Sequence, residues 1–149
     1  MKKRVMCGVL TLTLLSVIGQ AAGYKEVPLK GSGTGMITSF VPQQNGTVAI
    51  TVIGSGESTL LGKFTRSEEI VLDPATGTVS GTIVFTAADG SELNCSFTGG
   101  FISATTLVGI YTFTGGTGRF DGASGTAYFS AVQLSQTDVT FEFAGAIEF

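Results

Sequence analysis

Few side chains in this chain could carry out chemistry, and histidine is absent from all 149 residues. Its absence excludes Ser-His-Asp and Cys-His nucleophilic systems and removes the most common general base and metal ligand. The two cysteines, Cys7 and Cys95, are too few for a zinc site built on cysteines. The sequence therefore predicts neither a metal site nor a cofactor.

Carboxylates are the remaining candidates for acid–base chemistry. Glu68 and Glu69 are adjacent, so in a strand they would point to opposite faces and could not act together. The other candidates lie beside a turn or on the polar face of the last strand: Asp89, Glu92, Glu142 and Glu148. We expect all of these carboxylates to be solvated at the surface. Asp121 either caps a turn beside a salt-linked or solvent-facing Arg119, or forms with Arg119 a pair that faces a ligand at the barrel mouth.

Cys95 and Tyr111 are the polar groups expected on the apolar side of the strands. Cys95 shares its face with Leu93 and Phe97, which predicts a small, inert, buried thiol; a thiol that projects into a ligand cavity is the alternative. Tyr111 is inward by the same alternation, and its hydroxyl would need a hydrogen-bond partner if buried.

The elements that must position these residues are β-strands. The chain is rich in Gly, Thr, Ser, Phe and Val, and turn signals recur about every ten residues. The last strand alternates most clearly, with one apolar face formed by Val139, Phe141, Phe143, Ile147 and Phe149. About eight antiparallel strands with one apolar face favour an all-β, closed eight-stranded barrel, because closure removes unpaired edges. A β-sandwich is the alternative.

A glycine-rich segment follows the sixth expected strand. Gly115, Gly116 and Gly118 precede Phe120, and a second turn with Gly122 and Gly125 leads into the next strand. Glycine accepts positive φ and close backbone approach, so this segment is predicted to be a tightly folded structural turn.

The sequence GGTGRF of this turn resembles the allene oxide cyclase and dirigent barrel families. Residues 61–65 (LGKFT) and Asp73-Pro74 extend the resemblance, over residues 59–149, to secreted bacterial relatives of that barrel. It implies an allene oxide cyclase-like, calycin-like barrel with an apolar interior cavity. In such enzymes the cavity steers cyclisation or coupling of a reactive substrate, but no catalytic residue carries over to this chain.

The first 23 residues have the three parts of a secretory signal peptide. Lys2, Lys3 and Arg4 precede an apolar run, and small residues end it at Ala21 and Gly23. An uncleaved anchor is the alternative, although the run is shorter than the ~20 residues that span a bilayer. We therefore expect a signal peptide over 1–23, a barrel domain over 24–149 and a secreted or periplasmic protein.

The charge balance limits the partners. The chain has 8 Lys and Arg against 11 Asp and Glu, and three of the basic residues lie in the expected signal peptide. An acidic domain repels phosphate backbones and anionic headgroups, so we expect no nucleic acid and no membrane partner after cleavage. A homo-oligomer remains open.

The inward register mixes aromatic residues with very small ones, which predicts a narrow apolar pocket. The expected ligand-binding residues are Cys95, Phe97, Tyr111, Phe113, Phe129 and Phe141. The leading hypothesis is an exported, non-catalytic barrel that binds a small apolar ligand or has a structural envelope role. An isomerase or cyclase, allene oxide cyclase-like or dirigent-like, is the alternative, as is a filled, purely structural or adhesive barrel.

Overall fold

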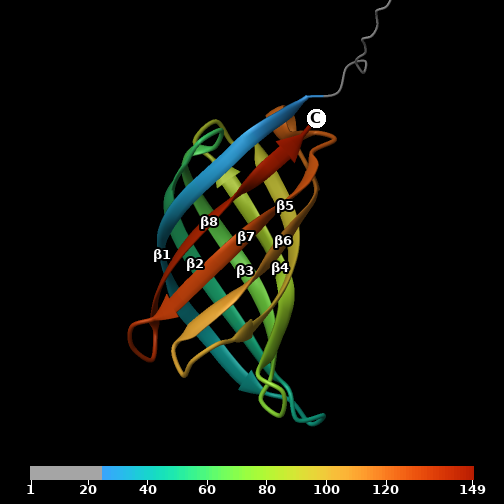
Figure 1. Cartoon of the computed structure of the whole chain (residues 1–149). Coiled ribbons are helices and arrows are strands. Elements are labelled where there is room, and N and C mark those ends of the chain that lie inside the picture. The colour runs from blue at the N-terminus through green and yellow to red at the C-terminus, as the bar shows by residue number, and fades with distance from the viewer. Residues whose placement is uncertain (1–24) are drawn as a thin grey trace, which may run out of the picture.

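The computed structural model describes residues 25–149, so the predicted signal peptide lies outside the described residues. Eight strands and one short 3-10 helix follow one another along the chain (Figure 1). Their bounds are β1 Glu26–Pro42, β2 Val48–Ser58, β3 Gly62–Asp73, β4 Thr78–Ala87, β5 Glu92–Phe101, β6 Thr106–Gly116, η2 Gly118–Phe120, β7 Ser124–Gln133 and β8 Asp138–Glu148. No helix within residues 25–149 is long and apolar enough to cross a membrane.

The strands form one closed antiparallel barrel in the order β1 to β8. Each strand pairs with its neighbour in sequence, and β1 pairs with β8 to close the sheet, from Glu26 opposite Glu148 to Met36 opposite Asp138. Figure 1 shows the blue β1 and the red β8 side by side along this seam. The predicted all-β, eight-stranded barrel is confirmed, and the β-sandwich alternative is wrong.

The third strand differs from the sequence prediction. The sequence pattern predicts a strand over residues 59–65 that continues after a bend through residues 70–72, whereas β3 runs without a break from Gly62 to Asp73 and pairs with β2 along its whole length. Unbroken alternation points Phe64, Arg66 and Glu68 into the barrel, since each is buried and the residues between them are exposed. One arginine and one glutamate therefore lie in the core.

The barrel has two unlike ends. We call the open end the one formed by the β1–β2, β3–β4, β5–β6 and β7–β8 hairpins. The closed end carries the β2–β3, β4–β5 and β6–β7 connections and both ends of the described chain, with the C-terminus beside the start of β1 (Figure 1).

The closed end is packed with large apolar side chains. Phe85, Leu93 and Ile147 are fully buried, and Phe64 meets Phe85 edge-on with ring centroids 5.3 Å apart. Such T-shaped pairs add to the free energy gained by burial alone.

Glycines on β1 make room for the rings of β8. A Cβ atom on Gly31 would lie 2.6 Å from Cζ of Phe143, and one on Gly33 would lie 2.7 Å from Cζ of Phe141. Because these positions have no side chain, the two phenyl rings lie directly over the backbone of β1. Along the seam, the very small inward residues of β1 thus leave the space that the large inward rings of β8 occupy.

Candidate functional site

A buried cluster of three polar side chains lies inside the barrel. Arg66 Nη1 donates a hydrogen bond of 2.8 Å to the Tyr111 hydroxyl, and Arg66 Nη2 lies 2.6 Å from Glu68 Oε2. Arg66 and Glu68 come from β3, whereas Tyr111 comes from β6 on another part of the wall. The side chains of Arg66 and Glu68 are 3% and 8% exposed, so this ion pair is shielded from bulk water.

Aromatic rings enclose the guanidinium. The Arg66 Cζ atom lies 3.4 Å from the ring centroid of Phe141 and 5.7 Å from that of Phe85. Tyr111 stacks on Phe129 with centroids 4.6 Å apart and planes 17° apart. A desolvated cation over an aromatic face is stabilised by the ring quadrupole, which offsets part of the cost of burying the charge. The cluster is therefore held in one arrangement by both polar and aromatic contacts.

One donor of this cluster has no partner. Arg66 Nε is buried and makes no hydrogen bond, although its guanidinium is paired through both other nitrogens. A buried unsatisfied donor is costly, so native structures satisfy nearly all of them with protein groups, water or ligands. Arg66 Nε is therefore the buried nitrogen of the cluster that no protein group satisfies.

Burial controls the protonation of the cluster. Burial raises the pKa of the Glu68 carboxyl, and the adjacent Arg66 guanidinium opposes part of that rise. Burial likewise raises the pKa of Tyr111 above its usual value, against the pull of Arg66, so the phenol stays protonated at ordinary pH. For Cys95, burial raises the pKa of the thiol to about 12, and the thiolate that nucleophilic chemistry requires is therefore scarce.

A cavity of about 100 Å³ lies between this cluster and the open end. Arg66, Glu68 and Tyr111 form its floor together with Phe97 and Phe129. Apolar side chains form the wall and rim of the cavity: Ile37, Ile50, Val52, Ile70, Leu72, Val79, Phe101, Leu107, Ala131 and Val139. Thr105 and Gln133 are the polar residues of the rim. The cavity is thus apolar on its sides and carries its charged and hydroxyl groups at the bottom.

The structure divides the expected ligand-binding residues into two groups. Phe97, Tyr111 and Phe129 line the cavity. Cys95, Phe113 and Phe141 are buried in the core but do not line it. Their inward orientation follows the predicted alternation, but Cys95 and Phe113 lie toward the closed end, and Phe141 is covered by the Arg66 guanidinium.

Arg66 and Glu68 are the residues that sequence reasoning missed. The expectation that Glu68 is solvated is wrong, because Glu68 is 6% exposed and faces the lumen. The signal was present in the alternation of Phe64, Ile70 and Leu72, which places positions 66 and 68 on the same face. Residue type alone predicts charged side chains at the surface, and here the unbroken alternation of β3 overrides that preference.

The glycine-rich turn closes the other end of the barrel. Gly118 has φ of +57°, and Phe120 is buried at 1% exposure beneath it. A Cβ atom on Gly116 would collide with the backbone carbonyl oxygen of Glu92, and Gly115 has φ of +132°. This segment is compact and belongs to the closed end, away from the cavity.

Arg119 in this turn pairs with a different carboxylate from the one expected. Its Nε lies 2.7 Å from Asp89 Oδ2, and its Nη1 donates to the carbonyl oxygen of Leu60 at 2.8 Å. Asp121 is exposed and makes no ion pair with Arg119. The pair that was considered as ligand-facing is therefore absent, and Arg119 instead ties together three connections of the closed end.

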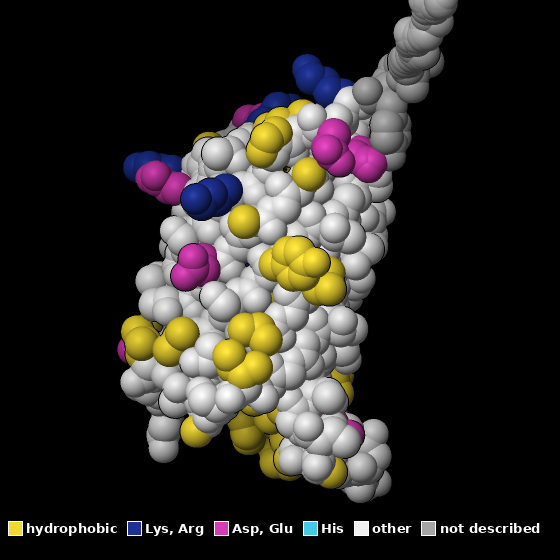
Figure 2. All heavy atoms as spheres, viewed as in Figure 1, with side chains coloured by type: hydrophobic (Ala, Val, Ile, Leu, Met, Phe, Trp, Pro, Cys, Tyr) yellow, Lys and Arg dark blue, Asp and Glu magenta, His cyan; other side chains and the backbone are white. Residues whose placement is uncertain are grey.

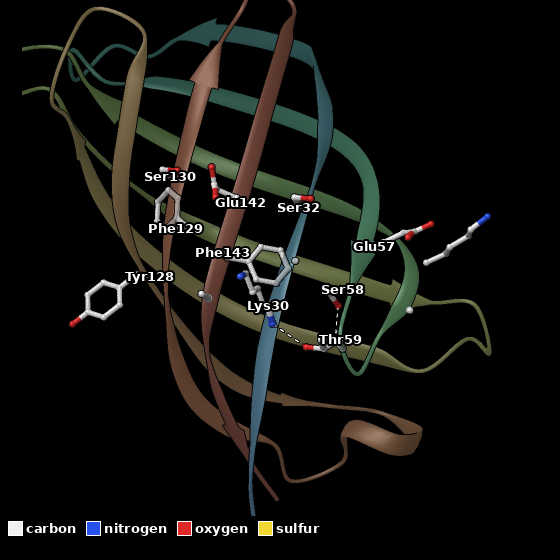
Figure 3. A pocket seen from close by; sticks show the side chains of 14 residues that line it. Lys30, Ser32, Glu57, Ser58, Thr59, Tyr128, Phe129, Ser130, Glu142 and Phe143 are labelled. Atoms are coloured by element: carbon white, nitrogen blue, oxygen red, sulfur yellow. Dashed lines mark hydrogen bonds between the residues drawn. The ribbon is translucent and has the colours of Figure 1, made fainter.

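A second, wider hollow of about 930 Å³ lies on the outer wall over β1, β2, β7 and β8. Figure 3 shows Tyr128 pointing outward from the wall, with Lys30, Glu57 and Glu142 around the hollow. The dashed hydrogen bonds in Figure 3 are structural: the Lys30 backbone N–H donates to Thr59 Oγ1 at 2.9 Å, and Ser58 Oγ donates to the carbonyl oxygen of Thr59 at 2.7 Å. Exposed charges around a shallow hollow lack the buried, convergent polar groups of a specific site, so the lumen cavity is the candidate.

Among residues 25–149 no group of three or more His, Cys, Asp or Glu side chains is arranged to hold a metal ion. Arg66, Glu68 and Tyr111 are themselves an ion pair with a phenol, and a neighbouring guanidinium would repel a cation. The donor set of the lumen therefore suits an organic molecule with a hydrogen-bonding group.

The comparisons with known proteins concern the fold of this barrel. No protein-family model matches the chain, and no curated protein does. Among solved structures, the pterocarpan synthase dirigent protein GePTS1 matches with a TM-score of 0.57 and 17% identity, over 87% of this chain and 88% of that chain. The pterocarpan synthase dirigent protein PsPTS1 matches with a TM-score of 0.52 and 17% identity, over 87% and 97%. The fold that the GGTGRF turn predicted is confirmed.

Proposed function

We propose that this barrel binds a small, mainly apolar molecule in the lumen cavity without transforming it. The observation that carries this proposal is an apolar cavity that ends on Arg66, whose buried Nε–H has no partner. Apolar walls supply most of the affinity, and a few convergent polar groups fix the orientation. The ligand would enter with its apolar body against the walls and an acceptor atom toward Arg66.

The size of the cavity limits the ligand. A volume of about 100 Å³ is below the roughly 300–1,000 Å³ of common ligand pockets, while an engineered apolar cavity of about 150 Å³ holds benzene. A short chain or part of one ring would fill the lumen, and the rest of the molecule would extend past the rim at Phe101 and Gln133. The purely structural alternative is weakened by this hollow, although the closed half is filled.

A matched pair of substitutions tests the binding site. Ala131 lines the cavity, whereas Ala144 is exposed on the outer wall, so Ala131→Phe fills the lumen and Ala144→Phe does not. With a single-ring apolar fluorescent probe, we expect saturable binding at one site, lost in Ala131→Phe and retained in Ala144→Phe. If both variants bind the probe equally, or if only Ala144→Phe loses binding, the probe does not bind in the lumen and the proposal is overturned.

A second candidate function is that of a dirigent-like or allene oxide cyclase-like isomerase or cyclase. It is favoured by Glu68 and Tyr111 at the cavity floor, since a buried carboxyl with a raised pKa is a typical proton donor or acceptor. The matching structures are named as pterocarpan synthases, which is consistent with such a reaction. Chromatography and mass measurement of the recovered molecule separate the two: a ligand released unchanged supports binding, and an isomer whose formation is lost in Glu68→Gln supports catalysis.

We also propose that the protein is exported, on the strength of the basic, apolar and small-residue segments in residues 1–23. N-terminal sequencing of the secreted or periplasmic fraction is expected to begin at residue 22 or 24. A chain that still begins at Met1 there contradicts the cleavage.

A further inference from the structure

Two of the four hairpin loops at the open end hold a large apolar side chain in solvent, and the strand ends beside the other two loops carry such side chains as well. Ile102 in the β5–β6 hairpin is 68% exposed, Leu134 in the β7–β8 hairpin is 64% exposed and Phe40 beside the β1–β2 hairpin is 59% exposed. Phe101, at the cavity rim, is 39% exposed. Figure 1 shows these hairpins at the same end of the barrel. We call Phe40, Phe101, Ile102 and Leu134 the apolar rim.

The positive charges lie at the opposite end. The exposed Lys and Arg residues of the described chain are Lys25, Lys30, Lys63 and Arg119, and all four lie in the closed half. Figure 2 shows the dark blue side chains gathered at the upper end of the view, away from the open-end hairpins. Glu69, Asp73, Asp138 and Glu142 are the charged residues in the open-end halves of their strands, outside the lumen. The apolar rim therefore has no cation beside it and a few anions.

We propose that the apolar rim docks on the surface of an electrically neutral phospholipid layer, with the cavity mouth facing the lipid. Apolar side chains at the tips of loops enter the boundary between headgroups and acyl chains, and the gain grows with the buried apolar area. Neutral lipid fits the charge pattern, because binding to anionic lipid depends on basic residues near the surface. The expectation of no membrane partner rested on repulsion from anionic headgroups, which a neutral layer does not exert.

A fluid layer suits this rim better than a protein partner does. The apolar side chains stand on separate hairpins around an opening, whereas a protein interface has a continuous, close-packed apolar centre. A layer of lipid adapts to separate tips without matching their shape. Docking there would also let an apolar ligand pass between the lipid and the lumen cavity without crossing water.

Vesicles of pure phosphatidylcholine test the proposal. The barrel of residues 25–149 closes on itself, so it can be studied without the apolar N-terminal segment. We expect it to co-sediment with these vesicles, and Ile102→Asp/Leu134→Asp to weaken binding about tenfold or more, since an aspartate is strongly disfavoured in the apolar layer. Ile110→Asp is the matched control: Ile110 is 42% exposed on the side wall, and its replacement should leave binding unchanged.

Charge dependence gives a second readout. Added salt should leave binding unchanged, and mixing phosphatidylglycerol into the vesicles should weaken it, because the open end carries anions and no exposed cation. Binding that grows with phosphatidylglycerol would assign the contact to the closed-end lysines and overturn the proposal. No co-sedimentation, or equal loss in Ile110→Asp, would also overturn it.

Two further checks keep the outcomes separable. Sedimentation velocity that shows a dimer lost in the double variant, with no vesicle binding, would make the rim an interface between copies of this chain. Ile102→Ser/Leu134→Ser replaces the aspartate pair if that variant fails to fold. Neither residue lines the cavity, so probe binding in the lumen should persist in both variants whatever the vesicles show.

Discussion

The closed and open halves of the barrel are built from the same strands but are filled differently. The closed half holds interlocking rings such as Phe64, Phe85 and Phe143, with Phe120 of the glycine-rich turn over them. The open half has a cavity of about 100 Å³ and half-exposed apolar residues around its rim. Arg66, Glu68 and Tyr111 lie at the boundary. The large apolar rings are thus concentrated at one end, and the proposed ligand site lies at the other.

The largest effect is expected from removing one charge of the Arg66–Glu68 pair at the boundary between the two halves. Arg66→Met leaves the Glu68 carboxylate buried without its cation, which should lower the free energy of unfolding by about 3–5 kcal/mol. Denaturant unfolding followed by circular dichroism measures this change. The double variant Arg66→Met/Glu68→Leu is the control, because removing both charges should restore most of the loss. A double variant as unstable as the single one contradicts an electrostatic cause.

A pair of phenylalanines compares the two halves directly. Phe85 is fully buried in the closed half, so Phe85→Ala should cost about 3–5 kcal/mol through lost burial and a new cavity. Phe101 is 39% exposed at the rim, so Phe101→Ala should cost less than about 1 kcal/mol. Equal shifts in the denaturation midpoint would show that the two halves contribute equally to stability.

The glycine-rich turn should have an intermediate effect. Gly116→Val places a side chain against the carbonyl oxygen of Glu92, and Gly118→Val forces a branched residue to a φ of +57°. Each should cost about 1–3 kcal/mol through backbone strain. Gly100→Val is the matched control, since the nearest atom to its added Cβ is 3.7 Å away. Thermal midpoints unchanged in both turn variants would rule out strain at this turn.

The smallest effect is expected at the surface pair that ties the closed end. The Ser91 backbone N–H and then Arg119 hold the pKa of Asp89 below its ordinary value of 3.8. A lowered pKa in the folded state stabilises the fold above that ordinary value, and the contribution is lost as pH falls through the folded value. In Asp89→Asn the free energy of unfolding should therefore fall less steeply as the pH drops through the acid range. At neutral pH it should be slightly lower than that of the unchanged protein. If the free energy of unfolding of both proteins falls equally with pH in the acid range, the effect does not come from Asp89.

The fold could be predicted because its signals are local. Strand alternation depends on neighbouring residues, and turns such as Asp89-Gly90 are recognised from two residues. Tyr111 was recognised as inward and in need of a partner for the same reason. The partner could not be predicted, since Arg66 comes from β3 and reaches Tyr111 only after the barrel closes.

The site was less predictable than the fold because it depends on distances across the lumen. Alternation shows that Phe97, Phe113 and Phe129 face inward, but not which of them borders empty space. That depends on how rings from opposite strands fill one volume, as Phe143 does over Gly31. The pairing of Arg119 with Asp89 rather than Asp121 has the same origin, because two connections meet only in the folded chain.

The seam between β1 and β8 also constrains the order in which the barrel can form. Every other strand pair joins neighbours in sequence, so those hairpins can form as the chain becomes available. The seam joins Glu26 to Glu148 and cannot close until the last strand is present. Until then both edge strands expose unpaired backbone groups, which is the state most prone to aggregation. A chain truncated within β8 would keep those edges permanently, so the eleven-residue strand β8 is required for the closed form of the barrel.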